Sequence, residues 1–106
     1  MIDTLKTLSE TVAKANDLFY ARNACVDTLM GIMDKTLRKQ GIKADAITID
    51  CITANKKIVL VVHDSKPDAV DIALGDKDGV IDSSSSHRCA DINEHFLLTL
   101  MENNFL

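Results

Sequence analysis

The sequence has few aromatic residues, prolines and glycines. It contains no tryptophan, one tyrosine, three phenylalanines, one proline and four glycines. Its core must therefore be built mainly from aliphatic side chains and methionine. The shortage of aromatic rings also argues against a stacking surface for single-stranded nucleic acid. With 46% hydrophobic and 26% charged residues, the composition is that of a globular chain and excludes an intrinsically disordered one.

Long apolar runs and a secretion signal are also missing. No run approaches the roughly 20 apolar residues of a transmembrane helix, and the first residues lack the basic and hydrophobic regions of a signal peptide. The three cysteines, Cys25, Cys51 and Cys89, are odd in number and have no CxxC spacing. This usage is typical of reduced thiols. We therefore expect a cytoplasmic protein that does not contact a membrane.

Charge is unevenly distributed along the chain. The net charge is −4, but residues 1–60 carry nine basic against seven acidic residues (+2), and residues 61–106 carry three against nine (−6). An acidic second half lacks the basic face that nucleic-acid binding requires. We therefore expect no nucleic-acid partner, while a basic protein partner or simple solubility fits the acidic surface.

The first third of the chain has a strong helical pattern. Residues 3–39 contain no proline and a single glycine, Gly31, and their apolar side chains recur at helical spacing. An unbroken helix would be roughly 55 Å long, whereas a compact domain of this size spans about 35 Å. We predict one long or kinked helix that needs a partner, with a break into two helices near Asn23 as the alternative.

The end of this region carries a helix stop. Three cations in the last turn complement the helix dipole: Lys35, Arg38 and Lys39. Gly41 then occupies the first position after the helix cap. We predict a Schellman ending there, in which Ile42 packs back on Leu37.

Two strands are predicted next. Residues 46–53 alternate between apolar and polar positions, as in a half-buried strand. Residues 58–62 (Ile-Val-Leu-Val-Val) are apolar on both faces and mostly β-branched. A run of that kind belongs in the interior of a sheet or at an interface.

The following segment fits two structures. Residues 67–75 alternate like a strand, but they also carry helix-cap and helix-stop residues. We favour the strand because residues 75–79 then form a hairpin connection to a short strand at 80–82. The serines at 83–86 are interpreted as a polar loop.

A second helix closes the chain. Asp91 and Glu94 form a capping pair for a helix with an apolar inner face. The predicted fold is therefore a single α+β domain over residues 1–106, with a long or kinked N-terminal helix, a four-stranded antiparallel β-meander and a C-terminal helix in two layers.

The apolar stripe of the first helical region supports our main functional hypothesis. Its spacing of three and four residues suits a self-associating seam, although it also suits a helix packed on its own sheet. Met30 and Met33 are typical of an adaptable contact surface. We predict a homodimer interface formed by Leu18, Phe19, Val26, Leu29, Ile32 and Met33.

A competing hypothesis places a small-ligand or catalytic site at the loops that follow the strands. Its residues are His63, Asp64, His87 and Cys89. His87 and a nearby helix N-terminus favour a Cys89 thiolate, but the sequence supplies no oxyanion donor or orienting group.

Metal binding and catalysis are both disfavoured by the residue patterns. Two histidines and a cysteine, His87, Cys89 and His95, have the donor types of a zinc site but not the ligand spacing of a zinc module. We therefore predict no metal and no cofactor. The function we expect is that of a small cytosolic, non-enzymatic protein-interaction module, such as an adaptor, a regulator or a chaperone-like protein, acting as a homodimer.

Overall fold

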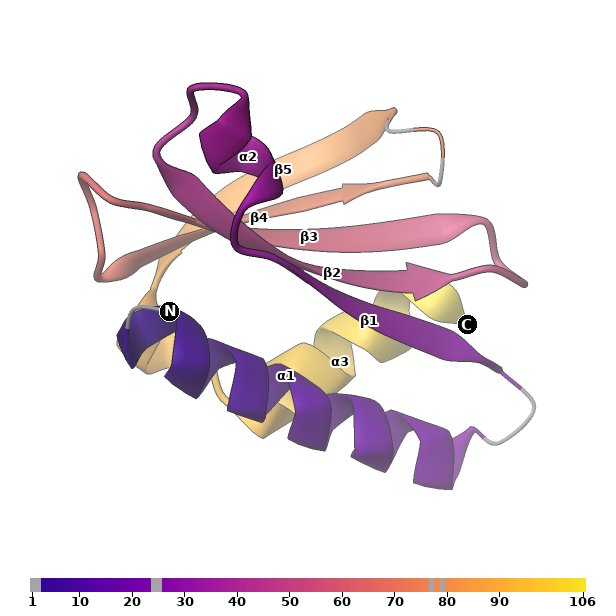
Figure 1. The fold of residues 1–106 in the computed structure, drawn as a ribbon. Coiled ribbons are helices and arrows are strands. Elements are labelled where there is room, and N and C mark those ends of the chain that lie inside the picture. The colour runs from indigo at the N-terminus through magenta and orange to yellow at the C-terminus, as the bar shows by residue number, and fades with distance from the viewer. Residues whose placement is uncertain (1–2, 24–25, 77, 79) are drawn as a thin grey trace.

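A computed structural model describes residues 3–23, 26–76, 78 and 80–106 (Figure 1). The elements in chain order are α1 (Asp3–Arg22), β1 (Thr28–Met33), α2 (Thr36–Lys39), β2 (Ala44–Cys51), β3 (Lys56–His63), β4 (Ala69–Gly75), β5 (Ile81–Arg88), the 3₁₀ turn η1 (Cys89–Asp91) and α3 (Glu94–Phe105). The five strands form one antiparallel sheet in the order β1-β2-β3-β4-β5, so each strand pairs with its neighbour in the sequence. The predicted α+β class is confirmed, with five strands instead of four.

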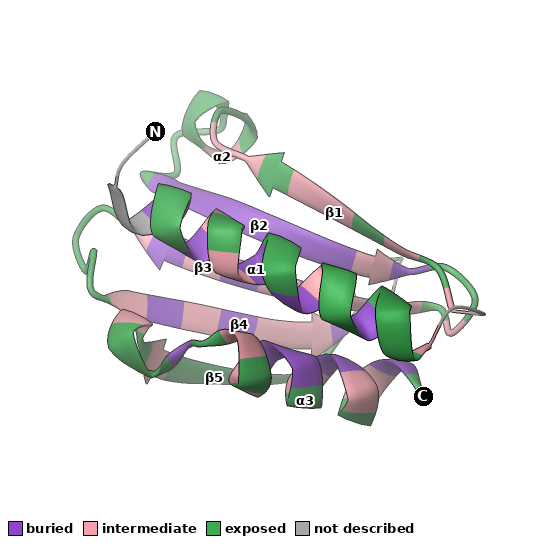
Figure 2. Ribbon diagram, turned by 90° about the horizontal axis from the view of Figure 1, so that it is seen from below, coloured by how far each residue is buried: buried purple, intermediate pink, exposed green. Residues whose placement is uncertain are grey.

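Both long helices lie side by side against one face of the sheet, which we call the helix face (Figures 1 and 2). The core fills the space between the two helices and this face of the sheet. α1 contributes residues three or four positions apart, namely Leu5, Leu8, Val12, Ala15 and Phe19. α3 contributes Leu97, Leu98, Met101 and Phe105. Alternate residues of the central strands complete the core, among them Ile47, Ile49, Ile58, Leu60, Val70 and Ile72. The core is therefore mostly aliphatic, as the composition requires.

α1 ends at Arg22, so the prediction of a helix over residues 3–39 is wrong beyond that point. Asn23 closes the helix, because its backbone N–H and its side-chain amide both donate to the Phe19 carbonyl, at 2.8 and 3.3 Å. Residues 28–33 (TLMGIM) form the strand β1 instead. An apolar run of this length does not distinguish helix from strand by spacing, and its glycine and β-branched residues lower its helix propensity.

The helix stop predicted at Gly41 is confirmed. Gly41 has a positive φ of 84°, and its N–H donates to the Arg38 carbonyl at 3.1 Å. The Ile42 N–H donates to the Leu37 carbonyl at 2.9 Å. These are the two hydrogen bonds of a Schellman motif, and here they end the single turn of α2.

The strand predicted within residues 67–75 is confirmed as β4, but the loop predicted at 83–86 is wrong. Those serines form the middle of β5 and pair with residues 71–74 of β4. The hairpin between the two strands is closed by Asp76. Its side chain accepts hydrogen bonds from the N–H groups of Asp78 and Val80, at 2.9 and 3.1 Å.

The capping pair predicted for α3 is also wrong. The N-cap is Asn93, whose side-chain oxygen accepts a hydrogen bond from the Phe96 N–H at 2.8 Å. Asp91 lies in η1 and contacts the Arg88 guanidinium at 3.3 Å. None of the helices formed by the described residues is long and apolar enough to cross a lipid bilayer.

Candidate protein interface

The sheet face opposite α1 and α3 is covered by neither of these helices (Figure 1). We call it the open face. Residues that lie opposite one another in an antiparallel pair share a face, so the register assigns to it Leu29, Met33, Ala46, Thr48, Val59, Val61, Ala73 and Ile81. Its charged side chains lie toward the ends of the strands. Lys57 Nζ is 3.7 Å from Asp50 Oδ1 at one end, and His63 Nε2 is 3.5 Å from Asp71 Oδ2 at the other. The open face is therefore apolar along β3, where Val59 and Val61 lie, while Asp71, Ser84 and Ser86 make it polar toward β5. Ala46 and Thr48 on β2 are already buried.

A hollow of about 260 Å³ indents the open face. Its lining is mostly apolar and consists of Lys57, Val59, Val61, Ala73, Gly75, Asp76, Val80 and Ile81. Val80 and Ile81, where β5 begins, are 60% and 63% exposed. The sequence signal for this surface is the run at 58–62, because a strand that buries only one face does not need apolar residues on both.

In the part of the chain that the structure describes, β1 forms one edge of the sheet and pairs with β2 alone. Its sequence contains no charged residue and no proline. Two of its large side chains are well exposed, Leu29 at 58% on the open face and Ile32 at 43% on the helix face. The free edge of β1 therefore presents apolar side chains on both faces of the sheet.

A third exposed side chain, the Tyr20 ring of α1, lies on the side of the helix nearest β1. The Thr28 hydroxyl donates a hydrogen bond to the side-chain oxygen of Asn16, which ties β1 to α1. Tyr20 lies one helical turn beyond Asn16 and so on the same side of α1. Tyr20 is 56% exposed. The helix layer thus adds an exposed aromatic ring on the side nearest β1.

The six predicted interface residues fall into two groups. Leu29, Ile32 and Met33 all belong to β1, so the structure brings these three together. The others come from α1 and the segment after it. Leu18 is 42% exposed, Val26 is partly buried against the core, and Phe19 is fully buried and packs on α3. Phe19 is therefore a core residue of the single chain.

The four residues of the ligand hypothesis lie at one end of the sheet but do not converge. His63 is on the open face, and its partner Asp71 also accepts a hydrogen bond from the Ser86 hydroxyl. The carboxylate therefore holds both groups, and the serine does not donate to the imidazole. A nucleophile activated by a general base needs the opposite order, with the imidazole in the middle.

Asp64 is held by Arg38. The guanidinium donates to both Asp64 oxygens at 2.8 Å, and it also binds Asp45, a carboxylate that is only 3% exposed. The hydrogen bonds from Arg38 hold the pKa of Asp64 below its ordinary value. Asp64 therefore stays ionised as a partner of Arg38 and is poorly suited to act as a general base.

His87 and Cys89 lie in different surroundings. His87 points to the helix face, where its ring meets Phe96 edge to face at 5.1 Å and its Nε2 lies 2.8 Å from the Ser85 hydroxyl. Burial, and then the nearby Asp68 carboxylate, raise the pKa of the Cys89 thiol. An activated nucleophilic cysteine requires a lowered pKa. The arrangement is therefore the reverse of the one a catalytic Cys89 would need.

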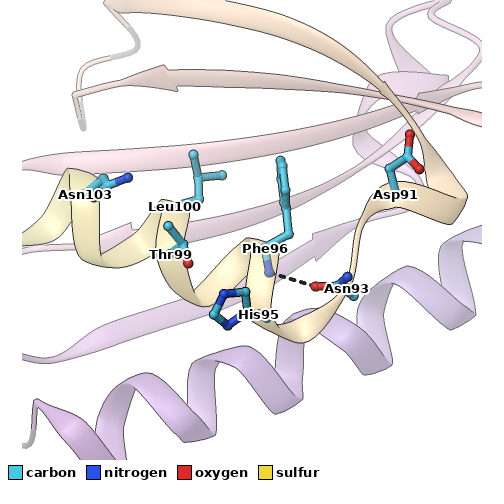
Figure 3. A pocket seen from close by; sticks show the side chains of 7 residues that line it. All are labelled: Asp91, Asn93, His95, Phe96, Thr99, Leu100 and Asn103. Carbon is cyan, nitrogen blue, oxygen red and sulfur yellow. Dashed lines mark hydrogen bonds between the residues drawn. The ribbon is translucent and has the colours of Figure 1, made fainter.

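A second pocket, of about 470 Å³, runs along α3 (Figure 3). It is lined by Asp91, Asn93, His95, Phe96, Thr99, Leu100 and Asn103. Phe96 and Leu100 point the same way from the helix, while the Asn93 side chain is bonded to the helix N-terminus. Within the described ranges, no three histidine, cysteine, aspartate or glutamate side chains are placed to hold a metal ion. Among the described residues, this pocket therefore offers no candidate metal site.

The fold and its surface define a small α+β protein with an open face that is apolar along β3 and an uncharged edge strand. Comparisons of the chain with protein-family models, with characterised proteins and with solved structures found no match.

Proposed function

We propose that this protein is a non-enzymatic interaction module that acts as a homodimer in the cytoplasm, in the manner of an adaptor, a regulator or a chaperone-like protein. The observation that supports the proposal most directly is the exposure of Leu29 and Ile32 on the uncharged edge strand β1. Natural proteins usually protect such edges with charges, proline or a covering element. Clustered apolar side chains at an unprotected edge are typical of a surface that another chain covers.

The polar groups support an interaction module over an enzyme. Arg38 is held by two carboxylates, and the Asp71 carboxylate is shared by His63 and Ser86. These groups hold one another in place, and none of them is paired as nucleophile and base. A site near His63, Asp64, His87 and Cys89 remains the alternative hypothesis.

The open face provides a surface for a second protein. Its apolar part along β3 offers contact area, and the hollow beside Val59 and Ala73 offers a place for an apolar side chain. The acidic second half of the chain suits a partner with a basic surface. In this proposal the dimer carries out recognition, and no chemical step is required.

The absolute mass in solution tests the proposal. Light scattering over a concentration series should give twice the chain mass of 11.6 kDa at micromolar concentration. Lysine at an exposed β1 position, in Leu29→Lys or Ile32→Lys, should shift the protein toward the monomer, because the new charge would have to be buried. Ile81→Lys is the matched control, since Ile81 is 63% exposed at the start of the other edge strand.

Variants of the alternative site complete the experiment. His63→Ala and Cys89→Ala should leave the dimer unchanged if the interface does not involve these residues. A wild-type protein that stays monomeric over the whole concentration range would refute the homodimer.

A further inference from the structure

We infer that two copies of the chain associate by pairing β1 with β1 in antiparallel orientation, in a register centred on Gly31, so that two five-stranded sheets join into one of ten strands. This inference rests on the proposed homodimer and specifies its geometry. It is carried by the composition of the two edge strands, by the faces on which the side chains of β1 lie, and by the charges at the two ends of β1.

The two edges of the sheet differ in charge. β5 contains Asp82 and Arg88 together with four exposed serines. Charged side chains on an edge strand resist pairing with another chain, because pairing would desolvate them. β1 has no charged residue over its whole length, and its large side chains are apolar. β1 is therefore the edge suited to accept another strand.

The register determines which side chains meet. With Gly31 opposite Gly31, Leu29 of one copy lies opposite Met33 of the other, and Met30 lies opposite Ile32. The first pair belongs to the open face and the second to the helix face. Each pair therefore joins residues of the same face, and the helix layers of both copies lie on the same side of the combined sheet. All four of these cross-strand pairs, counting both copies, are apolar.

The charges at the ends of β1 favour the same register. Asp27 and Lys35 flank the strand and are both exposed. The chain bends at Asp34 and Lys35, so the ladder ends at Met33. The same register still brings Asp27 to the end of the partner strand that carries Lys35, and the two-fold symmetry makes this approach twice. A slip of one residue would instead bring Asp27 toward Asp34, and it would set open-face residues against helix-face residues. Like charges directly opposite one another are destabilising. Gly31 is therefore the favoured centre.

The pairing would account for the exposed apolar residues of this region. Leu29 and Ile32 would be covered by the second strand, and Tyr20 would lie between the two helix layers. The two open faces would become one continuous surface. A partner of the dimer would therefore find roughly twice the apolar area that one chain presents.

A charge-exchange experiment tests the register. Asp27→Lys and Lys35→Asp should each raise the dimer dissociation constant about tenfold at low salt, since each replaces two favourable pairs by two repulsive ones. The double variant should return the constant to within about threefold of wild type. Asp34→Lys is the control. It should have little effect in the register centred on Gly31, but it should tighten the dimer in the slipped register.

A second pair of variants separates the edge from the open face. Ile32→Lys should dissociate the dimer, while Val59→Lys, on the open face of the central strand β3, should not. Circular dichroism checks that each variant is folded. If Val59→Lys dissociated the dimer and Ile32→Lys did not, edge pairing would be overturned, but the homodimer itself would not. Single charge variants without effect, or a double variant that does not recover, would overturn the register. A monomeric wild type would refute the proposed function itself.

Discussion

The rings of Phe19 and Phe105 meet edge to face, with centroids 6.0 Å apart and ring planes at 84°. Phe19 is fully buried and Phe105 is 4% exposed. The contact joins α1 to α3 beneath the sheet. Two ion pairs flank it on the surface, between Arg22 and Glu102 and between Lys14 and Glu94. Exposed pairs of this kind contribute little, so the aromatic contact and the surrounding apolar side chains hold the two helices together.

Replacing Phe19 should strongly destabilise the protein. Phe19→Ala removes a fully buried ring and leaves a cavity, which typically costs about 3–5 kcal/mol. Urea unfolding followed by circular dichroism measures the change in the free energy of unfolding. Leu106→Ala is the control, because this neighbouring side chain is 65% exposed and its loss should cost less than about 0.5 kcal/mol. Similar effects of the two variants would contradict the placement of Phe19 in the core.

Removing the N-cap of α3 should lower the free energy of unfolding by less than removing the Phe19 ring. Asn93→Ala removes the acceptor for the Phe96 N–H and should lower the free energy of unfolding by about 1 kcal/mol. Asn93→Asp should retain the stability, because aspartate caps helices equally well. Asn103→Ala, at an exposed position later in the same helix, serves as the comparison. Thermal unfolding of the four proteins tests the order, and a stability of Asn93→Ala equal to that of wild type would show that the cap is not needed.

Asp64 should make the stability sensitive to acid. Hydrogen bonds from Arg38 lower the pKa of Asp64 in the folded protein. Its contribution is therefore fully present above the unfolded pKa of about 3.9 and is lost as the pH falls through the lower, folded value. Asp64→Asn should be less stable than wild type at pH 7 and should lose less stability between pH 4 and pH 2.

Urea unfolding over that pH range measures the difference. Asp82→Asn is a suitable control, because the Asp82 side chain is 59% exposed and its contact with Lys56 Nζ is long, at 3.4 Å. Parallel pH profiles for wild type and Asp64→Asn would rule out the proposed role of the Arg38 contact.

The Cys89 thiol should react slowly with alkylating reagents. Burial and the Asp68 carboxylate raise its pKa, so the thiolate that reacts with iodoacetamide is scarce at neutral pH. We expect Cys89 to react several-fold more slowly than free cysteine at pH 7.5. The apparent pKa of the reaction should lie above the ordinary value of about 8.5. Mass spectrometry of the alkylated peptides follows this residue separately from the other cysteines.

A variant of Asp68 tests whether its carboxylate contributes to the raised pKa of Cys89. Asp68→Asn should lower the apparent pKa and speed the reaction, because it removes a negative charge near the thiol. If Cys89 of the wild-type protein reacted faster than free cysteine, the result would support the catalytic hypothesis.

The parts of the fold that the sequence predicts well have local causes. Gly41 with Ile42 indicates a Schellman motif, which needs only the residues of one turn. The run at 58–62 has the length, branching and apolar character of a buried strand, and it forms most of β3. The α+β class follows from such segments, because each carries its structure in its own pattern.

The missed parts depend on distant residues. The serines at 83–86 bury no apolar side chain, so they carry no strand pattern, and their pairing with β4 alone makes them a strand. β1 is apolar on both faces, and its strand structure is set by β2, where Gly31 leaves room for Thr48. A Cβ atom at position 31 would lie 2.9 Å from the Thr48 hydroxyl oxygen. The sequence pattern also does not separate the exposed Leu29 and Ile32 from the buried Phe19, because exposure on an edge strand requires knowing where the sheet ends.

The strictly sequential strand order has a consequence for synthesis of the chain. Each strand pairs with the one made just before it, so the sheet can form progressively as the chain leaves the ribosome. α1 is made early, but one of its sides is closed only by α3, whose last residue is Phe105. Until that residue has been made, Phe19 lacks its aromatic partner. A chaperone that shields the emerging α1 would therefore protect the stage at which aggregation threatens most.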